Sequence, residues 1–420
     1  MKIHLILLEA VIGGLKLIFE DKKAADKVIE QLLKANPRWG ARDRGFVAET
    51  MYDMVRHWRL LWCVVQKPEN FHPKALFEIW GIYHQLFHTE MEGREKEIQR
   101  IWQQIGLTSR FLPDIWRERY ETAKTQPEVF HSFSDWMHER AKAELGEEWE
   151  AQMVALNQKA KVILRVNTLK TTIDALQQQL AKEFGIETDR VEGAADALVL
   201  QRRVNLFQHA TYQAGLFEIQ DANSQLVASF LNAEAGMRVI DACAGAGGKT
   251  LHLAALMQNR GKIISLDVED RKLQELQRRA KRAGANIIET KLIENHKTIK
   301  RLTASADRLL LDVPCSGIGV LRRNPDAKWK LSSEFLAQVQ QTQQEILRTY
   351  SKMLKPEGQM VYATCSILPS ENQQQVVIFL AQNPDFELIE EKILLPSTSH
   401  FDGFYMAKLG KKEAKELDKS

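Results

Sequence analysis

The spacing of apolar residues divides the chain into a helical first part and an alternating second part. From residue 1 to about residue 150, apolar side chains recur at steps of three or four, for example at Val47, Met51, Val55, Trp58 and Trp62. This spacing is typical of amphipathic helices that bury one stripe. We therefore predict an all-helical domain over residues 1–150.

Beyond residue 155, short apolar runs alternate with helical patterns. Two strand-like runs, Val162–Val166 and Ala197–Leu200, flank a helical pattern at Thr171–Phe184, which predicts a small α+β, RRM-like module over residues 155–232. Residues 233–410 then alternate between strand and helix throughout, which is typical of an α/β, Rossmann-like doubly wound sheet with helices on both faces. The charged residues 411–420 are expected to form a fraying helix or a disordered tail.

Within the large domain the elements can be placed from the apolar runs. We expect strands at Arg238–Asp241, Lys262–Asp267, Asn286–Glu289, Leu309–Asp312 and Gln359–Ala363, with further strands near Phe386 and Phe404. Helices are expected between them, at Lys249–Gln258, Arg271–Ala283 and Ser333–Leu354.

Two of these predicted strands end in a cysteine. Leu309–Asp312 leads into Pro314 and Cys315, and Gln359–Ala363 leads into Cys365. If the two strands are parallel neighbours, the cysteines share one rim of the sheet, about 5 Å apart. Two thiols and the Asp312 carboxylate would then face a common crevice.

A glycine-rich turn follows the first strand of the same domain. The segment DACAGAGGKT, residues 241–250, lets a ligand approach the backbone at the start of a helix. A phosphate-binding P-loop is excluded because Cys243 stands where that motif needs glycine, and a dinucleotide fingerprint is excluded because Thr250 replaces its third glycine. An adenosine ligand without a pyrophosphate remains.

Asp267, at the end of the second strand, supports that ligand class. A carboxylate there can accept both ribose hydroxyls, although Asp267 alone could equally cap the following helix. The cationic sulfonium of S-adenosylmethionine (SAM) would be attracted to Asp241 and Asp312, which favours SAM over other adenosine ligands.

Methyl transfer to an unactivated pyrimidine carbon requires a thiol. Carbon 5 of cytosine becomes nucleophilic only after a thiolate adds to carbon 6, and a base must then remove the proton from carbon 5. Asp312 could donate a proton at ring nitrogen 3 if its pKa is raised in a closed cleft. The target base must be unpaired or flipped out. For Cys63 and Cys243 we favour inert packing over chemistry.

Composition adds few constraints. The chain has 420 residues, a net charge of +3 and four cysteines without a CxxC pair, which predicts neither disulfides nor a metal site. The apolar amino terminus is interrupted by Glu9 and Lys16, so we expect an amphipathic first helix there and no membrane segment. We expect the enzyme to be cytoplasmic and monomeric. A basic cluster follows Cys315 and could contact phosphates beside the flipped base through Arg322, Arg323, Lys328 and Lys330.

Three motifs carry a resemblance to a known family. DACAGAGGKT, LLDVPCSGIGVLRRNPDAKW and VYATCSILPSEN together resemble the Nop/Sun family of RNA cytosine-5 methyltransferases, and in particular its bacterial type that acts on small-subunit ribosomal RNA. Three further segments, RVNTLK, GLFEIQDANSQL and DGFYMAKL, are also similar to that family, and the first helices resemble its antitermination-factor-like RNA-binding domain.

The resemblance implies roles for individual residues. It makes Cys365 the nucleophile, Cys315 the thiol that assists release, and Asp312 a residue between cofactor and base. Asp267 is implied as a cofactor contact, together with Cys243, Ala244, Gly245, Ala246, Gly247, Gly248 and Lys249. The family usually has an alanine–proline pair in place of Gly245 and Ala246, and Glu294 is the nearest counterpart of its adenine-recognising acid.

Other functions stay open at this stage. Ribosomal RNA is the expected substrate, with transfer RNA second. A non-catalytic RNA-binding factor for ribosome assembly would retain RNA without transferring a methyl group. Methylation of a small molecule or a protein would leave the helical domain without a task.

Overall fold

The computed structural model describes residues 4–66, 73–87, 94–107 and 113–413, and the chain divides into two compact units. One unit combines Met1–Gln158 with Leu321–Ser333, and the other combines Lys159–Val320 with Glu334–Ser420. The segment Leu321–Ser333 therefore belongs to the helical unit, although the sequence analysis assigned it to the large domain.

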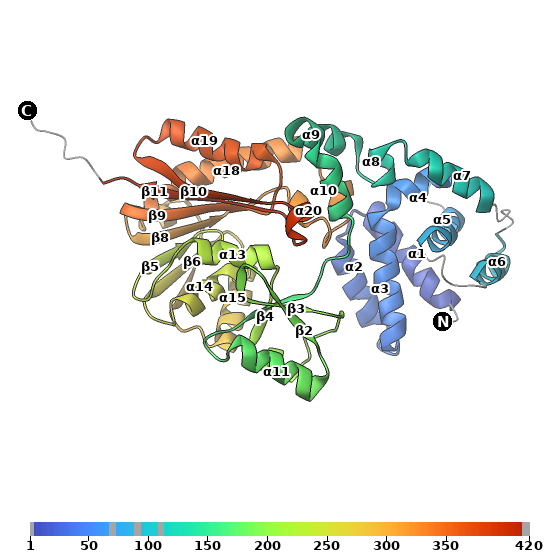
Figure 1. The fold of residues 1–420 in the computed structure, drawn as a ribbon, viewed down its shortest axis with the longest axis horizontal. Coiled ribbons are helices and arrows are strands. Elements are labelled where there is room, and N and C mark those ends of the chain that lie inside the picture. Colours follow the sequence, from blue (N-terminus) through green and yellow to red (C-terminus); the bar gives the residue numbers. More distant parts are fainter. Residues whose placement is uncertain (1–3, 67–72, 88–93, 108–112, 414–420) are drawn as a thin grey trace, which may run out of the picture. The chain divides into compact units, whose positions relative to one another are not determined.

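Helices make up the described part of the amino-terminal unit (Figure 1). The apolar stripe predicted from the sequence is part of its core: Val47, Met51 and Val55 are fully buried and Trp58 is nearly so. The helices are α1 (Leu5–Phe19), α2 (Ala25–Ala35), α3 (Ala41–Arg56), α4 (Trp58–Val64), α5 (Pro73–Phe87), α6 (Arg94–Gln104), α7 (Pro113–Ala123), α8 (Pro127–Phe130), α9 (Asp135–Leu145) and α10 (Glu148–Leu156).

The segment Leu321–Ser333 packs against these helices through two buried basic side chains. Lys328 Nζ donates to Asn157 Oδ1 at 2.5 Å and to the carbonyl of Arg56 at 3.2 Å, and the side chain is fully buried. Arg322 is also buried and donates to the carbonyl of Ala155 at 2.9 Å. The prediction that Arg322 and Lys328 contact RNA phosphates is therefore wrong, because these side chains fix the segment to the helical unit. The segment Leu321–Ser333 contains the short helix α17 (Ala327–Lys330).

The second unit begins with a four-stranded antiparallel sheet in the order β2-β3-β1-β4. One face packs under α11, whose first turn is capped by the Thr172 hydroxyl. The other face is covered too, since Arg165 and Glu218 are both 3% exposed. Its elements are β1 (Ile163–Val166), α11 (Ile173–Phe184), β2 (Thr188–Val191), β3 (Ala194–Leu200), α12 (Ala210–Gln213) and β4 (Phe217–Ile219).

The large domain is built on a seven-stranded sheet in the order β10-β11-β9-β8-β5-β6-β7, counted over the described residues. Strands β9, β8, β5, β6 and β7 are parallel, and β11 and β10 continue the sheet antiparallel. The strands are β5 (Arg238–Asp241), β6 (Lys262–Asp267), β7 (Ile288–Leu292), β8 (Ala306–Asp312), β9 (Leu354–Thr364), β10 (Phe386–Leu394) and β11 (Phe404–Lys411).

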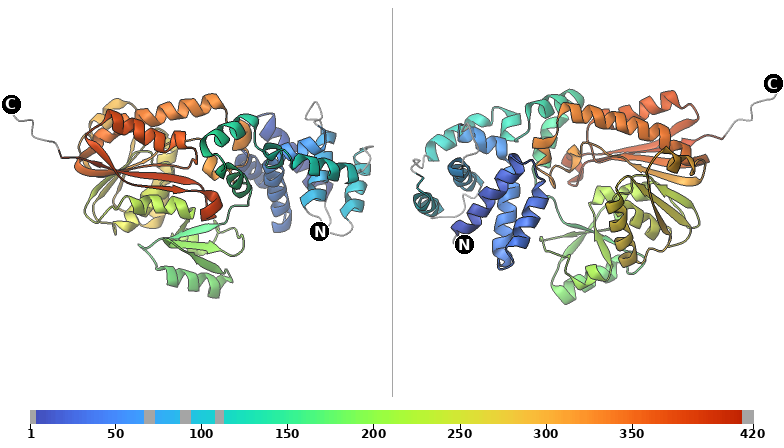
Figure 2. Two further views of the ribbon diagram at one scale, coloured as in Figure 1. Left: turned by 45° about the horizontal axis from the view of Figure 1, so that its top comes forward. Right: turned by 180° about the vertical axis from the view of Figure 1, so that it is seen from behind.

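Helices cover both faces of this sheet, as Figures 1 and 2 show. Neighbouring residues on one strand face opposite cores: Met360 packs on the side of α16, α18 and α19, and Val361 on the side of α13, α14 and α15. The predicted doubly wound α/β fold is confirmed. The helices are α13 (Ala222–Phe230), α14 (Gly248–Leu256), α15 (Asp270–Ala283), α16 (His296–Lys300), α18 (Ser333–Tyr350), α19 (Gln373–Gln382) and α20 (Pro396–Ser399), with 3-10 turns η1 (Ile318–Val320), η2 (Ser351–Met353) and η3 (Pro369–Glu371).

The main differences from the expected elements lie at their ends. The third strand lies at Ile288–Leu292, two residues beyond the expected start, and α18 ends at Tyr350. Lys411, the first residue of the predicted tail, belongs to β11 instead. It pairs with Phe386 of β10, next to the pair formed by Gly410 and Glu387. Residues 414–420 of the predicted tail lie outside the described part. No helix among the described residues is long and apolar enough to cross a bilayer.

We expect Lys328→Ala to lower the free energy of unfolding by about 3 kcal/mol, since it leaves buried acceptors unpaired and opens a cavity. Burial, with repulsion from Arg56, lowers the pKa of Lys328 well below its ordinary value. The unfolded chain therefore holds more protons in the window between the two pKa values, so wild-type stability should rise with pH relative to the variant.

Denaturant unfolding at pH 7 and pH 9 measures both effects. Lys142→Ala, on the exposed surface of α9, is the matched control and should change stability by less than about 0.5 kcal/mol. Equal stability of the Lys328 and Lys142 variants would contradict the assignment.

Candidate active site

The two cysteines lie beside each other at the ends of β8 and β9. The strands are parallel neighbours in which Asp312 pairs with Ala363, so both strands end at the same edge of the sheet. The sulfur atoms of Cys315 and Cys365 are 3.2 Å apart, and both thiols are free. The predicted closeness of the two thiols is thus observed, and it is tighter than the spacing between strands.

The two sulfurs differ in their surroundings. The hydrogen bond to Cys365 raises the pKa of Cys315 well above its ordinary value, and burial and repulsion from Cys365 and Glu371 act in the same direction. Cys315 therefore holds a proton that it can donate to Cys365. Cys365 in turn attracts Lys249, and this attraction is among the causes that raise the pKa of the lysine.

Asp312, the last residue of β8, forms an ion pair with Lys249. Lys249 Nζ donates to Asp312 Oδ2 at 2.5 Å, and the ammonium lies 5.3 Å from the centre of the Phe404 ring. Burial opposes the charged form of Lys249, but attraction to Asp312 outweighs it and raises the pKa of the lysine. The family resemblance gave Lys249 a place at the cofactor, whereas the structure places its side chain between Asp312 and Cys365.

A buried carboxylate that the sequence analysis did not single out joins the two cysteine loops. Glu371 accepts hydrogen bonds from the Ser316 amide at 2.7 Å and from the Ser316 hydroxyl at 2.5 Å. It also accepts from the Ser366 hydroxyl and, at 3.3 Å, from Gln343 Nε2. Ser316 and Ser366 directly follow Cys315 and Cys365, so one carboxylate fixes both loops. The motif VYATCSILPSEN contained Glu371, but nothing in its sequence indicates that the side chain is buried.

The glycine-rich turn connects β5 to α14 with a tight backbone. Gly245 and Gly247 have φ angles of 53° and 85°, a region that disfavours other residues. A Cβ atom on Gly247 would lie 2.5 Å from Leu276, so α15 also requires glycine there. The Gly247 amide donates to the Ala244 carbonyl at 2.9 Å and closes the turn.

Asp267 supports the turn from the end of β6. Its two carboxylate oxygens accept the Gly245 amide at 2.8 Å and the Glu269 amide at 2.9 Å. Both oxygens keep a second lone pair, so contact with ribose hydroxyls stays available. Of the alternatives left open for Asp267, capping of the following helix is not observed, because the N-cap of α15 is Glu269 and no side chain caps that helix.

A cavity of about 500 Å³ opens beside Asp267 and Asp312. Its volume lies within the range of small-molecule sites. Its lining combines an apolar wall with acids, as an adenosine ligand with a cationic sulfonium requires, so the residues present fit SAM. The predicted site residues that line it are Cys243, Gly245, Asp267, Glu294 and Asp312, and the apolar wall includes Ile293, Ile299, Val313, Pro314 and Ile346.

Other predicted residues lie around the cavity rather than along it. Asp241 is 1% exposed and accepts a hydrogen bond from the Thr250 hydroxyl at 2.6 Å, and burial raises its pKa to about 7. Asp241 does not line the cavity, whereas Asp312 and Asp267 do, so the attraction of a sulfonium to Asp241 stays a prediction. Burial also raises the pKa of Cys243 well above its ordinary value, which agrees with an inert thiol. Arg323 is half-buried in the segment that packs on the helical unit. No group of metal-ligating side chains occurs among the described residues.

Comparisons with known proteins identify the family of the chain. A family model described as 16S rRNA methyltransferase RsmB/F matches residues 228–410, and one described as the ferredoxin-like domain of RsmF/B-like methyltransferases matches residues 133–206. The chain is 31% identical to the probable ribosomal RNA small subunit methyltransferase B of Synechocystis sp., over 92% of this chain and 95% of that protein.

Solved structures give the same result. The crystal structure of PH0851 covers 98% of this chain and all of its own, with 25% identity and a TM-score of 0.80. A methyltransferase homologue from Pyrococcus horikoshii covers 68% of this chain and 97% of its own, with 27% identity and a TM-score of 0.61. A methyltransferase family agrees with the SAM cofactor predicted from the turn and the cavity. The chain belongs to the RsmB/F, or Nop/Sun, family of methyltransferases.

Proposed function

We propose that the protein transfers a methyl group from SAM to carbon 5 of a cytosine in ribosomal RNA, through a covalent adduct between Cys365 and carbon 6. The observation that carries this proposal is the 3.2 Å separation of the two sulfurs beside Asp312, which itself lines the cofactor cavity. An ordinary methyltransferase that acts on a nucleophilic atom needs no thiol, and two adjacent ones suit an acceptor carbon that must be activated.

Cys365 acts first, as the nucleophile. Its sulfur forms a bond to carbon 6, and the electron pair of the 5,6 double bond becomes available at carbon 5. Lys249 stabilises negative charge on the attacking sulfur, since the two groups attract each other. SAM supplies the methyl group as an electrophile on a cationic sulfur.

Cys315 acts in the release step. The largest cause of its raised pKa is the hydrogen bond to Cys365, and this cause disappears once the Cys365 sulfur is bonded to carbon. Cys315 then loses its proton to solvent more easily and, as a thiolate, removes the proton from carbon 5. The electron pair restores the 5,6 double bond and Cys365 leaves as a thiolate.

Asp312 and Lys249 act at the polar edge of the base. Asp312 must carry a proton to donate it at ring nitrogen 3, and Lys249 holds one 2.5 Å away on a shared hydrogen bond. Transfer along this bond, as charge builds on the ring, would supply the proton during the attack on carbon 6, and the same pair would take the proton back from nitrogen 3 when the 5,6 double bond is restored.

The substrate class rests on the relatives. The curated relatives are ribosomal RNA methyltransferases by name, and the family model is described as acting on 16S rRNA. Ribosomal RNA is therefore our first choice and transfer RNA the second, with the cytoplasm as the site of action. The helical unit is proposed to bind RNA as well, through residues other than Arg322 and Lys328.

Cys365→Ala should abolish methyl transfer because carbon 5 is never activated. Cys315→Ala should form the adduct but release it slowly, so protein–RNA complexes should persist on denaturing gels. Labelled methyl incorporation into ribosomal RNA and gel mobility measure the two outcomes. Cys63→Ala, in the helical unit, is the matched control and should behave as wild type.

Three outcomes count against the proposal. Full activity of the Cys365 variant would show that another group is the nucleophile. Rapid turnover by the Cys315 variant would remove its role in release. Binding of RNA by the wild type, without incorporation of methyl groups, would favour a ribosome-assembly factor.

Glu371→Gln should lower kcat about 100-fold with little change in KM for RNA. A glutamine amide turns one acceptor into a donor that faces the Ser316 and Ser366 hydroxyls, so the two loops lose their common anchor. The change also removes a charge that raises the pKa of Cys315, so the rising limb of the kcat profile should shift to lower pH.

Steady-state kinetics between pH 6 and pH 9 test the prediction. Glu387→Gln, an exposed acid on β10, is the matched control. An unchanged pH profile with a large loss of melting temperature would reduce Glu371 to a stabilising residue.

A further inference from the structure

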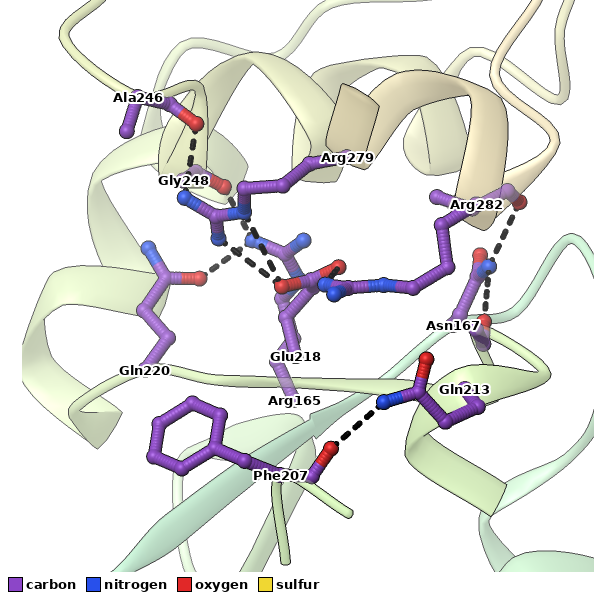
Figure 3. A network of polar contacts seen from close by, with 12 residues as sticks. Arg165, Asn167, Phe207, Gln213, Glu218, Gln220, Ala246, Gly248, Arg279 and Arg282 are labelled. Carbon is purple, nitrogen blue, oxygen red and sulfur yellow. Dashed lines mark hydrogen bonds and ion pairs between the residues drawn. The ribbon is translucent and has the colours of Figure 1, made fainter. Parts of the chain in front are cut away.

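Two arginines hold the outer side of the glycine-rich turn (Figure 3). Arg165, on β1 of the small module, donates to the Gly248 carbonyl and to the Gln220 side chain. Arg279, on α15, donates to the Ala246 carbonyl at 2.7 Å. Both carbonyls belong to the segment that we assign to the cofactor, yet neither arginine lines the cavity described above.

One buried carboxylate organises these cations. Glu218, on β4, accepts two hydrogen bonds from Arg279, at 2.9 and 3.2 Å, and pairs with Arg282 through its other oxygen. Burial lowers the pKa of Arg165 to about 10, while attraction to Glu218 acts against this shift, so the guanidinium remains charged at neutral pH. Buried charges of this kind are tolerated only with such partners.

An arginine that binds a backbone carbonyl also fixes the direction of the N–H group of the next residue. In a trans peptide the carbonyl of one residue and the N–H of the next point in opposite directions. Arg279 therefore turns the Gly247 amide toward Ala244, where it closes the turn, and Arg165 turns the Lys249 amide to the opposite side. The conformation of the turn, whose residue Gly245 lines the cavity, is thus held by side chains outside the cavity.

The small module is also fixed to the carboxyl end of α15. Asn167 donates to the Ala283 carbonyl at 2.8 Å and Lys170 to the Arg282 carbonyl at 2.6 Å. A Cβ atom on Gly215 would lie 2.1 Å from the Arg282 carbonyl, so the chain must have glycine at this approach. These residues come from the segments RVNTLK and GLFEIQDANSQL, whose role the sequence alone did not explain.

We infer that Arg279, with Arg165 and Glu218, is a positioning residue for the SAM turn, so that the small module controls cofactor affinity. The inference rests on the proposed cofactor. Without these contacts the turn would sample other conformations, and binding would have to restore its order.

Arg279 and Arg282 make a matched pair for the test. Both bind Glu218, but only Arg279 reaches the turn, and Arg282 packs against the Tyr212 ring. Titration calorimetry of the full chain with S-adenosylhomocysteine should give an affinity about tenfold weaker for Arg279→Gln, whereas Arg282→Gln should stay within about twofold of wild type. Melting temperatures of both variants report the loss of the ion pair.

The outcomes are distinct. Equal affinity in all three proteins, or an equal loss in both variants, overturns the inference while the proposed function stands. Failure of the wild type to bind S-adenosylhomocysteine overturns both. If Arg279→Gln does not fold, Arg279→Lys replaces it, because a lysine can pair with Glu218 but cannot reach Ala246 at the same time. The same tenfold loss is expected, and wild-type affinity of that variant again overturns the inference.

Discussion

The parallel pairing of β8 with β9 is the constraint on which the site depends. Neighbouring parallel strands end at one edge of a sheet, so Cys315 and Cys365, fifty residues apart, are brought to the same edge. The pairing does not by itself set a 3.2 Å sulfur distance, because loops beyond a strand are free to diverge. Glu371 supplies the missing restraint, since it binds both loops one residue after each cysteine.

The cofactor side of the site depends on a comparable arrangement of buried charge. Glu218 brings Arg279 and Arg282 together, and Arg165 is buried beside them. Isolated, each of these ions would be costly to bury, and together they orient a turn whose glycines give it no stiffness of its own. Glycines let the backbone of the turn approach a ligand closely. The buried ion pairs outside the turn then supply the rigidity that the glycines lack.

The sequence predicted the doubly wound fold and the meeting of the two cysteines because strand periodicity and strand ends are local signals. The spans of β5 and β6 agree with their expected ranges for the same reason. The charge of a side chain, by contrast, did not predict whether the side chain is buried or exposed. Lys328 and Lys330 look alike in the sequence, but Lys328 is fully buried while Lys330 is partly exposed and pairs with Asp326. Long-range partners such as Asn157 decide between these environments, and they leave no signal near the lysine.

The separate roles of the two cysteines could be assigned from the sequence only by family resemblance, since both follow a strand and precede a serine. Their neighbours differ in charge. Lys249 attracts Cys365, whereas Glu371 repels negative charge on Cys315. The anion beside Cys315 therefore favours the protonated form of that thiol, while the cation lies on the side of Cys365. This asymmetry supports the proposal that Cys365 is the nucleophile and that Cys315 acts at a different step.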